Sequence, residues 1–327
     1  MKLVNKILNK LNGLYYPQEY LCLAKESLQD TLCAWLVCKD QLTKDVTKLH
    51  LFVGYSPLIF TLPSSCLKEI DQDQLTIIDI LFTNKLLHPN ETLARKDAIA
   101  VLRLKKIKQQ IADSDTISYF EGIEGKHRFL SHFHQWIIGL NNRLNNKKAG
   151  NIFLHDNLYK QVQIAYSIPR NISLITVREN GGYNVFPTDL HGQIDNQHYI
   201  ISLRHDGKAC QQVSQARKIL ITQIHSQFFK TAYALGKNHM RDYREKENFP
   251  FSSSISANLQ LPLPESAIFY RELELTDSFI HGIHRLFLFR ILSWQQVQQN
   301  PSTLAHIHNV YATWRHNNKM TGNYLLR

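Results

Sequence analysis

Hydrophobic and polar positions alternate with the two-residue period of a β-strand through much of the second half of the chain. Residues 171–177 are rich in β-branched side chains, and residues 183–186 resume the pattern after the Arg-Glu-Asn-Gly-Gly sequence of residues 178–182. Asn and Gly tolerate positive φ, so this stretch predicts a β-hairpin with a tight turn. Two further strands are predicted at residues 199–204 and 218–224.

A short basic turn and a helix separate the last two of these strands. Arg204 ends the first strand, Gly207 and Lys208 lie in the turn, and residues 209–217 have a helical pattern. The free N–H groups and the dipole at a helix N-terminus favour a phosphate group. The turn therefore predicts an anion site, although the same residues also fit a solvated turn.

The first half of the chain has a less regular pattern. Strands are predicted at residues 31–38 and 49–62, the latter kinked at Pro57, whereas residues 75–82 fit a strand or a buried helix. Residues 94–110 are rich in helix-forming side chains and predict a helix. An opening helical piece carries one apolar stripe, formed by Leu3, Ile7 and Leu11.

Residues 127–146 predict the clearest helix of the chain. The polar run at residues 145–150 ends it and predicts a linker between a first domain, residues 1–150, and a second, residues 151–327. One face of this helix gathers the apolar side chains of Phe129, Phe133, Trp136, Ile137, Leu140 and Leu144.

Length and composition agree with two folded domains. The chain has 327 residues, of which 43% are hydrophobic and 20% charged, so it can build proper cores. The net charge is +11, but the basic residues are spread over both halves. A nucleic-acid-binding protein usually concentrates its charge on one face. The densest basic run, residues 103–108, is therefore interpreted as a solvated face, and no nucleic-acid partner is expected.

Five cysteines without a Cys-x-x-Cys pair argue against a disulfide framework and a cysteine zinc site, and they favour a reducing cytoplasm. The first residues lack the pattern of a signal peptide. The longest nearly apolar run, residues 51–62, is too short to span a bilayer. A soluble cytoplasmic protein without a membrane partner is expected.

Several short strings in the second half occur in the order found in a known family. They are Ile-Pro-Arg at residues 168–170, Asn-Val-Phe-Pro-Thr at 184–188, Ser-Leu-Arg at 202–204, Arg-Lys-Ile-Leu-Ile-Thr at 217–222, residues 261–275, and Gly-Ile-His-Arg-Leu-Phe-Leu at 282–288. Together they resemble the flavin reductase-like domain, an FMN-binding split barrel, over about half of the chain.

The resemblance implies an α+β fold with two domains. The C-terminal domain would be a split β-barrel of Greek-key type with short helices, following an N-terminal α+β domain of unknown type. It also implies bound FMN, NAD(P)H as co-substrate, hydride transfer to the flavin, and a homodimer. The alternative is a non-catalytic split-barrel scaffold with a degenerate flavin site, used for binding or dimerisation.

The family motifs assign a flavin site but no catalytic acid or base, since the cofactor carries the hydride chemistry. This chain departs from the family at Ala209, where the family has threonine, and at Phe289, where it has glycine. The residues that match the family's flavin-binding segments are Asn184, Val185, Phe186, Pro187, Thr188, Asp189, Ser202, Leu203, Arg204, His205, Lys208, Ala209 and His284.

Two further patterns leave alternatives open. The first half could be a degenerate second copy of the barrel, although an α+β accessory domain is the preferred interpretation. Among sixteen histidines, His132 and His134 lie two apart on a predicted helix and cannot share an ion. His306 and His308 could share one on a strand, but no other ligand stands nearby in sequence, so no metal site is expected.

Overall fold

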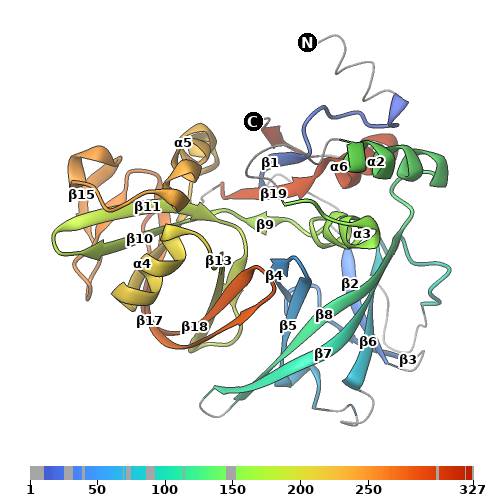
Figure 1. Ribbon diagram of the computed structural model, residues 1–327, viewed down its shortest axis with the longest axis horizontal. Helices are drawn as coiled ribbons and strands as arrows, with labels where there is room; N and C mark the ends of the chain where they lie inside the picture. The colour runs from blue at the N-terminus through green and yellow to red at the C-terminus, as the bar shows by residue number, and fades with distance from the viewer. Residues whose placement is uncertain are drawn as a thin grey trace. The chain divides into compact units, whose positions relative to one another are not determined.

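The computed structural model describes residues 11–25, 32–38, 41–68, 70, 75–85, 93–112, 115–144, 152–299, 302–320 and 322–325. The chain divides into two compact units, each assembled from three segments (Figure 1). Unit 1 comprises Met1–Leu21, Gln29–Ile168 and Ile307–Gly322, and unit 2 comprises Cys22–Leu28, Pro169–His306 and Asn323–Arg327. The linker predicted at residues 145–150 and most of the predicted opening helix lie outside the described residues, so the boundary near residue 150 stays a prediction.

Unit 2 is built on a seven-stranded antiparallel sheet with the order β11-β10-β14-β17-β18-β13-β12. The strands predicted near residues 171–177, 183–186, 199–204 and 218–224 are all present. The seven strands are β10 (Ser173–Glu179), β11 (Gly182–Thr188), β12 (His191–Gln193), β13 (His198–Arg204), β14 (Lys218–Ile224), β17 (Ala267–His281) and β18 (His284–Gln296).

The predicted hairpin joins β10 to β11. Glu179 pairs with Gly182, and the two turn residues between them, Asn180 and Gly181, have φ values of 50° and 82°. Positive φ at both positions is the geometry of the two-residue turns that match the twist of the flanking strands. The local sequence therefore sets the register of β11, which carries the first part of the predicted site.

Helix α4 (Lys208–Ala216) covers one face of this sheet and confirms the predicted helix. Its side chains at Ala209, Cys210 and Val213 are buried in the same apolar cluster as Phe287 and Phe289. Phe289, which replaces the family's glycine, is fully buried, so this departure fills the core of unit 2.

A long connection between β14 and β17 adds the remaining short elements of unit 2. Ala232 and Leu235 of helix α5 pack on Leu174 and Val185 of the β10–β11 hairpin. The elements in this connection are η4 (Ser226–Phe228), α5 (Phe229–Leu235), η5 (Gly236–Met240), η6 (Lys246–Asn248), β15 (Phe251–Ile255) and β16 (Pro262–Pro264).

Unit 1 contains a second seven-stranded antiparallel sheet, with the order β3-β2-β6-β7-β8-β5-β4. When the strands of each sheet are renumbered along the chain, both sheets have the order 2-1-5-6-7-4-3. The first half therefore repeats the strand order of the second, as the second-copy hypothesis requires. The strands are β2 (Cys33–Cys38), β3 (Gln41–Asp45), β4 (Leu51–Tyr55), β5 (Leu58–Pro63), β6 (Ile77–Thr83), β7 (Ala100–Ala112) and β8 (Asp115–His127).

Neither seven-stranded sheet is closed, because the end strands of each do not pair with one another in the described part of the chain. The antiparallel sheet of unit 2 with its short helices fits the expected split-barrel domain, but this sheet is open rather than closed. A smaller four-stranded sheet has the order β20-β1-β19-β9. Its strands are β1 (Tyr20–Ala24), β9 (Arg170–Asn171), β19 (Leu304–His308) and β20 (Tyr324–Leu325).

The structure corrects the prediction of a helix at residues 94–110. This segment enters strand β7, in which Ala100, Leu102 and Leu104 are buried on one face while the intervening residues are more exposed. Pairing with β6 on one side and β8 on the other outweighs the helix propensity of its lysines. The run at residues 49–62 is two strands rather than one, and residues 75–82 form most of β6.

The helix predicted at residues 127–146 begins later, because His127 ends β8, and α2 spans His132–Leu144. On its apolar face, Phe133, Trp136, Leu140 and Leu144 are exposed within the described structure. Unit 1 also contains the 3-10 turn η2 (Ser64–Cys66) and helices α3 (Asp156–Ala165) and α6 (Asn309–Asn317). Among the described helices, none has the length and apolar composition needed to cross a membrane.

Candidate functional site

Strand β11 carries the first group of predicted site residues, and the structure divides them. Asn184, Val185 and Phe186 are fully buried. The Asn184 side chain donates hydrogen bonds to Oε1 of Gln212 in α4, at 2.6 Å, and to the carbonyl of Asn238 in η5, at 3.0 Å. The Asn184 side chain therefore fastens β11 to α4 and η5.

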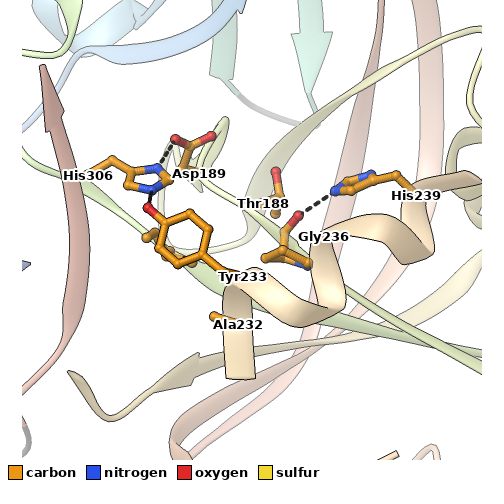
Figure 2. A pocket seen from close by; sticks show the side chains of 9 residues that line it. Thr188, Asp189, Ala232, Tyr233, Gly236, His239 and His306 are labelled. Carbon is orange, nitrogen blue, oxygen red and sulfur yellow. Dashed lines mark hydrogen bonds and ion pairs between the residues drawn. The ribbon is translucent and has the colours of Figure 1, made fainter. Parts of the chain in front are cut away.

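Pro187, Thr188 and Asp189 instead line a cavity of about 220 Å³ that lies within unit 2 (Figure 2). Helix α5 and the following turn η5 supply one wall, and β19 supplies His306. The complete lining consists of Ile172, Pro187, Thr188, Asp189, Ala232, Tyr233, Gly236, His239 and His306. The end of β11 is thus the part of the predicted segment that a small molecule can reach.

A chain of polar side chains borders this cavity. Asp189 Oδ2 accepts a hydrogen bond from His306 Nδ1 at 2.7 Å, and the other ring nitrogen of His306 bonds the Tyr233 hydroxyl (Figure 2). The Cys22 thiol donates to the same hydroxyl at 2.8 Å. Burial alone would lower the pKa of His306, but the hydrogen bond and charge of Asp189 outweigh it and raise this pKa to about 9. His306 is therefore a cation at neutral pH, paired with a carboxylate.

His239 connects the cavity to the predicted phosphate turn. Its Nε2–H donates to the carbonyl of Pro187 at 2.7 Å. Burial lowers the pKa of His239, so its ring is neutral at pH 7. A Cβ placed on Gly207 would lie 3.4 Å from the His239 carbonyl oxygen, so η5 contacts the start of α4. The two predicted halves of the site, the end of β11 and the turn before α4, thus meet at His239.

The phosphate turn presents two cations at the start of α4. Arg204 forms an ion pair with Asp206 at 2.7 Å, and Lys208 forms one with Asp242 at 2.6 Å. All four side chains are partly or largely exposed. Exposed pairs of this kind contribute about 0–1 kcal/mol, so an incoming anion could replace either carboxylate at small cost.

Backbone groups add to this cradle. Gly207 is the N-cap of α4 and supplies no side-chain oxygen. The first amides of the helix, those of Lys208 and Ala209, therefore donate no hydrogen bond to the side chain of the N-cap residue. Ala209 is buried and offers only its amide. His205 is exposed and lies in the same turn, while its own amide donates to the Ile283 carbonyl at 3.0 Å.

Ser202, Leu203 and His284 lie beneath this turn and are buried. Ser202 Oγ and His284 Nδ1 are 3.1 Å apart, and His284 is the ladder partner of Arg204. Burial, assisted by the nearby charges of Arg204 and His205, lowers the pKa of His284 to about 4. His284 is therefore neutral, and its side chain is buried on the strand that pairs with Arg204.

Sequence reasoning missed Tyr233, Gly236 and His239, and it weighed His306 only as half of a metal pair. In the structure His306 bonds Asp189, whereas His308 caps α6 by accepting a hydrogen bond from the Val310 amide. Asp189 and His306 are 117 positions apart, so no local pattern relates them. Among the described residues, no three potential ligand side chains gather into a metal site.

No known family profile matches the sequence, and no characterised protein matches it by sequence. Among solved structures, the FMN-binding protein from Thermus thermophilus with bound p-hydroxybenzaldehyde is 20% identical over 40% of this chain and 74% of its own, with a TM-score of 0.36. The Streptomyces globisporus NADH:FAD oxidoreductase SgcE6 is 12% identical over 45% and 87%, with a TM-score of 0.40. The flavin reductase PheA2 is 12% identical over 51% and 95%, with a TM-score of 0.37.

These identities and TM-scores describe a partial likeness of fold and carry no argument about activity. Over about half of its length, this chain resembles a flavin reductase-like domain.

Proposed function

We propose that unit 2 is a split-barrel domain of the flavin reductase type that binds FMN. The phosphate lies at Arg204, His205, Lys208 and the first amides of α4, and the ring lies along Pro187–Asp189 towards the cavity. The observation that carries the proposal is the junction at His239, which contacts both Pro187 and the start of α4. The end of β11, expected at the flavin ring, and the turn before α4, expected at the flavin phosphate, are therefore neighbours.

The residues present fit a flavin phosphate in charge and in donor type. A phosphate dianion would exchange two exposed carboxylate partners for charge-assisted hydrogen bonds from Arg204 and Lys208, and each such bond contributes roughly 1.5–3 kcal/mol. Asp189 does not oppose the ligand with a net charge, because His306 neutralises it.

When bound, FMN would accept a hydride from NAD(P)H, and this cofactor chemistry needs no protein acid or base. The chain's own residues bind and orient: Arg204 and Lys208 hold the phosphate, and His239 fixes the end of β11 through the Pro187 carbonyl. NAD(P)H dependence, a homodimer and a cytoplasmic location belong to the same proposal.

The test is a titration of the full chain with FMN and with riboflavin, followed by visible absorption and by melting temperature. Arg204→Ala should weaken FMN binding by about tenfold or more and leave riboflavin binding nearly unchanged, because riboflavin has no phosphate. Arg290→Ala is the matched control, since Arg290 forms a similar exposed ion pair with Glu274 at 2.6 Å outside the proposed site.

The alternative is a scaffold whose flavin site is degenerate. Two features favour it: Ala209 lacks the hydroxyl found in the family, and both cations of the turn already have carboxylate partners. If saturating FMN changes neither the spectrum nor the melting temperature, the scaffold interpretation replaces the flavin proposal. Equal losses of FMN and riboflavin in Arg204→Ala would assign Arg204 to the fold.

A further inference from the structure

Unit 1 has two adjoining cavities of its own, which we call the unit 1 groove. One has a volume of about 470 Å³ and lies over strands β6 to β8, and the other, of about 420 Å³, lies beside helices α2 and α3. His132, Gln135 and Lys160 line both cavities. Gln135 is fixed at the junction, because its Nε2 donates to the carbonyls of His127 and Leu130 at 2.9 Å each.

The first cavity is strongly basic. Two carboxylates, Asp79 and Glu124, line it, and both have cationic partners: Asp79 pairs with Arg95 and Arg103, and Glu124 pairs with Lys126 at 2.7 Å. The remaining cations of the lining are Lys96, Arg128 and Lys160, and none of them forms an ion pair with another described residue. Three like charges around one cavity favour an anionic occupant.

The wall of the same cavity also contains a buried polar side chain, that of His127. His127 is 5% exposed and lines the cavity, and its Nε2 bonds Gln163 at 2.9 Å. Its Nδ1 is buried without a hydrogen-bond partner in the described structure. A buried ring nitrogen without a hydrogen-bond partner costs free energy. A hydrogen bond from a polar group of a ligand would remove this cost.

The second cavity offers a surface for an aromatic ring. Trp136 lines it although 64% of its surface is exposed, and Tyr159 lies in the same wall. An indole face exposed at a cavity is the kind of platform on which planar bases stack. The groove thus has a cationic part and an aromatic part, joined at Gln135 and Lys160.

We propose that the unit 1 groove binds a nucleotide. Lys96, Arg128 and Lys160 contact the phosphates, the base stacks on Trp136, and the ligand spans the junction at Gln135. The proposal concerns a site separate from the flavin site of unit 2, and neither depends on the other.

The experiment uses the full chain and three probes: ATP, adenosine and inorganic pyrophosphate. Calorimetry and tryptophan fluorescence should show saturable ATP binding that weakens as salt rises. Pyrophosphate should compete with ATP, and adenosine should bind about tenfold more weakly or not at all, because it lacks the phosphates. Trp136→Phe should remove the change in fluorescence while ATP still binds.

Lys160→Glu and Arg128→Glu should each weaken ATP binding by about tenfold or more. Lys105→Glu is the matched control, since Lys105 is exposed on β7 of the same unit and lines neither cavity. It should change the affinity by no more than about twofold. Arg204→Ala in unit 2 should leave ATP binding unchanged.

Three results would overturn the proposal. The first is no ATP binding at millimolar concentration. The second is an equal loss of ATP affinity in Lys105→Glu and Lys160→Glu. The third is an ATP affinity that equals that of pyrophosphate and does not change in Trp136→Ala. The last would show an anion site that does not recognise a base. Melting temperatures of the variants distinguish a lost site from a lost fold.

Discussion

The two seven-stranded sheets share one strand order but differ in their connections. In unit 2 the connection after the fourth strand is helix α4, and the connection after the fifth contains α5 and η5, which wall the cavity. In unit 1 the fourth strand is followed by the short turn η2, while α2 and α3 come only after the seventh. The sheet is therefore a common frame, and each candidate site is made by the segments that join its strands.

The largest expected effect comes from truncating one buried phenylalanine in the core of each sheet, in separate variants. Phe60 in β5 and Phe287 in β18 are both fully buried. Replacing either with alanine should cost about 3–5 kcal/mol of unfolding free energy, because it removes apolar contacts and leaves a cavity. In urea unfolding, Phe60→Ala should shift only the transition of unit 1, and Phe287→Ala only that of unit 2.

Exposed isoleucines provide the controls for this pair. Ile111→Ala in unit 1 and Ile280→Ala in unit 2 should change the unfolding free energy by less than about 0.5 kcal/mol. A single transition that moves equally in both phenylalanine variants would show that the two sheets unfold as one cooperative body.

The next expected effect is that the stability of the two units depends on pH in different ways. His306 in unit 2 has its pKa raised to about 9 from an ordinary 6.5, so its pair with Asp189 stabilises fully below pH 6.5 and fades as pH rises to 9. The contribution is at most about 3 kcal/mol. Urea unfolding should show that Asp189→Asn destabilises unit 2 strongly at pH 6 and much less at pH 9. A difference that does not change with pH would contradict this.

His127 in unit 1 should behave in the opposite sense. Burial lowers its pKa to about 4, so the neutral ring is stable above pH 6.5 and unit 1 loses stability as pH falls from 6.5 to 4. His127→Gln should flatten this acid dependence in urea unfolding between pH 7 and 4. An acid slope as steep as that of the parent chain would assign the dependence to other groups.

Two buried carboxylates sharpen the comparison on a smaller scale. Glu272 in unit 2 accepts hydrogen bonds from the amides of Asn258 and Leu259, at 2.9 and 2.6 Å, and from Ser293 Oγ at 2.5 Å. Burial alone would raise its pKa, but these bonds outweigh burial and lower it. Glu272→Gln should cost about 1.5–3 kcal/mol at pH 7, and the loss should shrink as pH falls below about 4.

Asp79 in unit 1 serves as the counterpart of Glu272. It is paired with Arg95 and Arg103, whose side chains are 43% and 37% exposed and can turn to water. Asp79→Asn should therefore cost only about 1 kcal/mol, with a dependence on salt that Glu272→Gln lacks. Chemical unfolding at low and high salt measures both, and equal salt dependence would refute the distinction.

The smallest effect concerns the competitor for the proposed phosphate. Asp242→Ala releases Lys208 from its exposed ion pair and should strengthen FMN binding by about 0.2–1 kcal/mol, a factor of up to about five. Glu274→Ala, which releases Arg290 elsewhere in unit 2, is the control and should change nothing. Weaker FMN binding in Asp242→Ala would mean that Asp242 orders the turn.

The sequence predicted the elements whose signals are local. The Asn180-Gly181 turn specifies the β10–β11 hairpin, and the turn ending at Gly207 leads into α4. Residues 94–110 were assigned to a helix because propensity outweighed alternation, although Ala100, Leu102 and Leu104 already carry the two-residue period of β7. Partner strands decide such a segment, and a single sequence does not display them.

The sequence predicted two segments of the candidate site, β11 and the phosphate turn, but it did not predict the residues of α5 and η5 that lie beside them. Local motifs placed the residues of β11 and of the phosphate turn, but they could not give the direction of each side chain. Asn184 turned out to be buried, where its amide needs the partners that Gln212 and Asn238 supply. The link between Asp189 and His306 depends on tertiary structure alone, since it joins β11 to a strand 117 positions away.

Strand β1 has a consequence for the order of events during synthesis. Cys22 and Leu23 belong to unit 2 and pair with Leu325 and Tyr324, about 300 residues later. A ribosome adds about 5–20 residues per second, so these early residues wait on the order of 15–60 s for their partners. Unit 2 is therefore completed only after its last strand emerges, and until then the edge of β1 stands open to other chains.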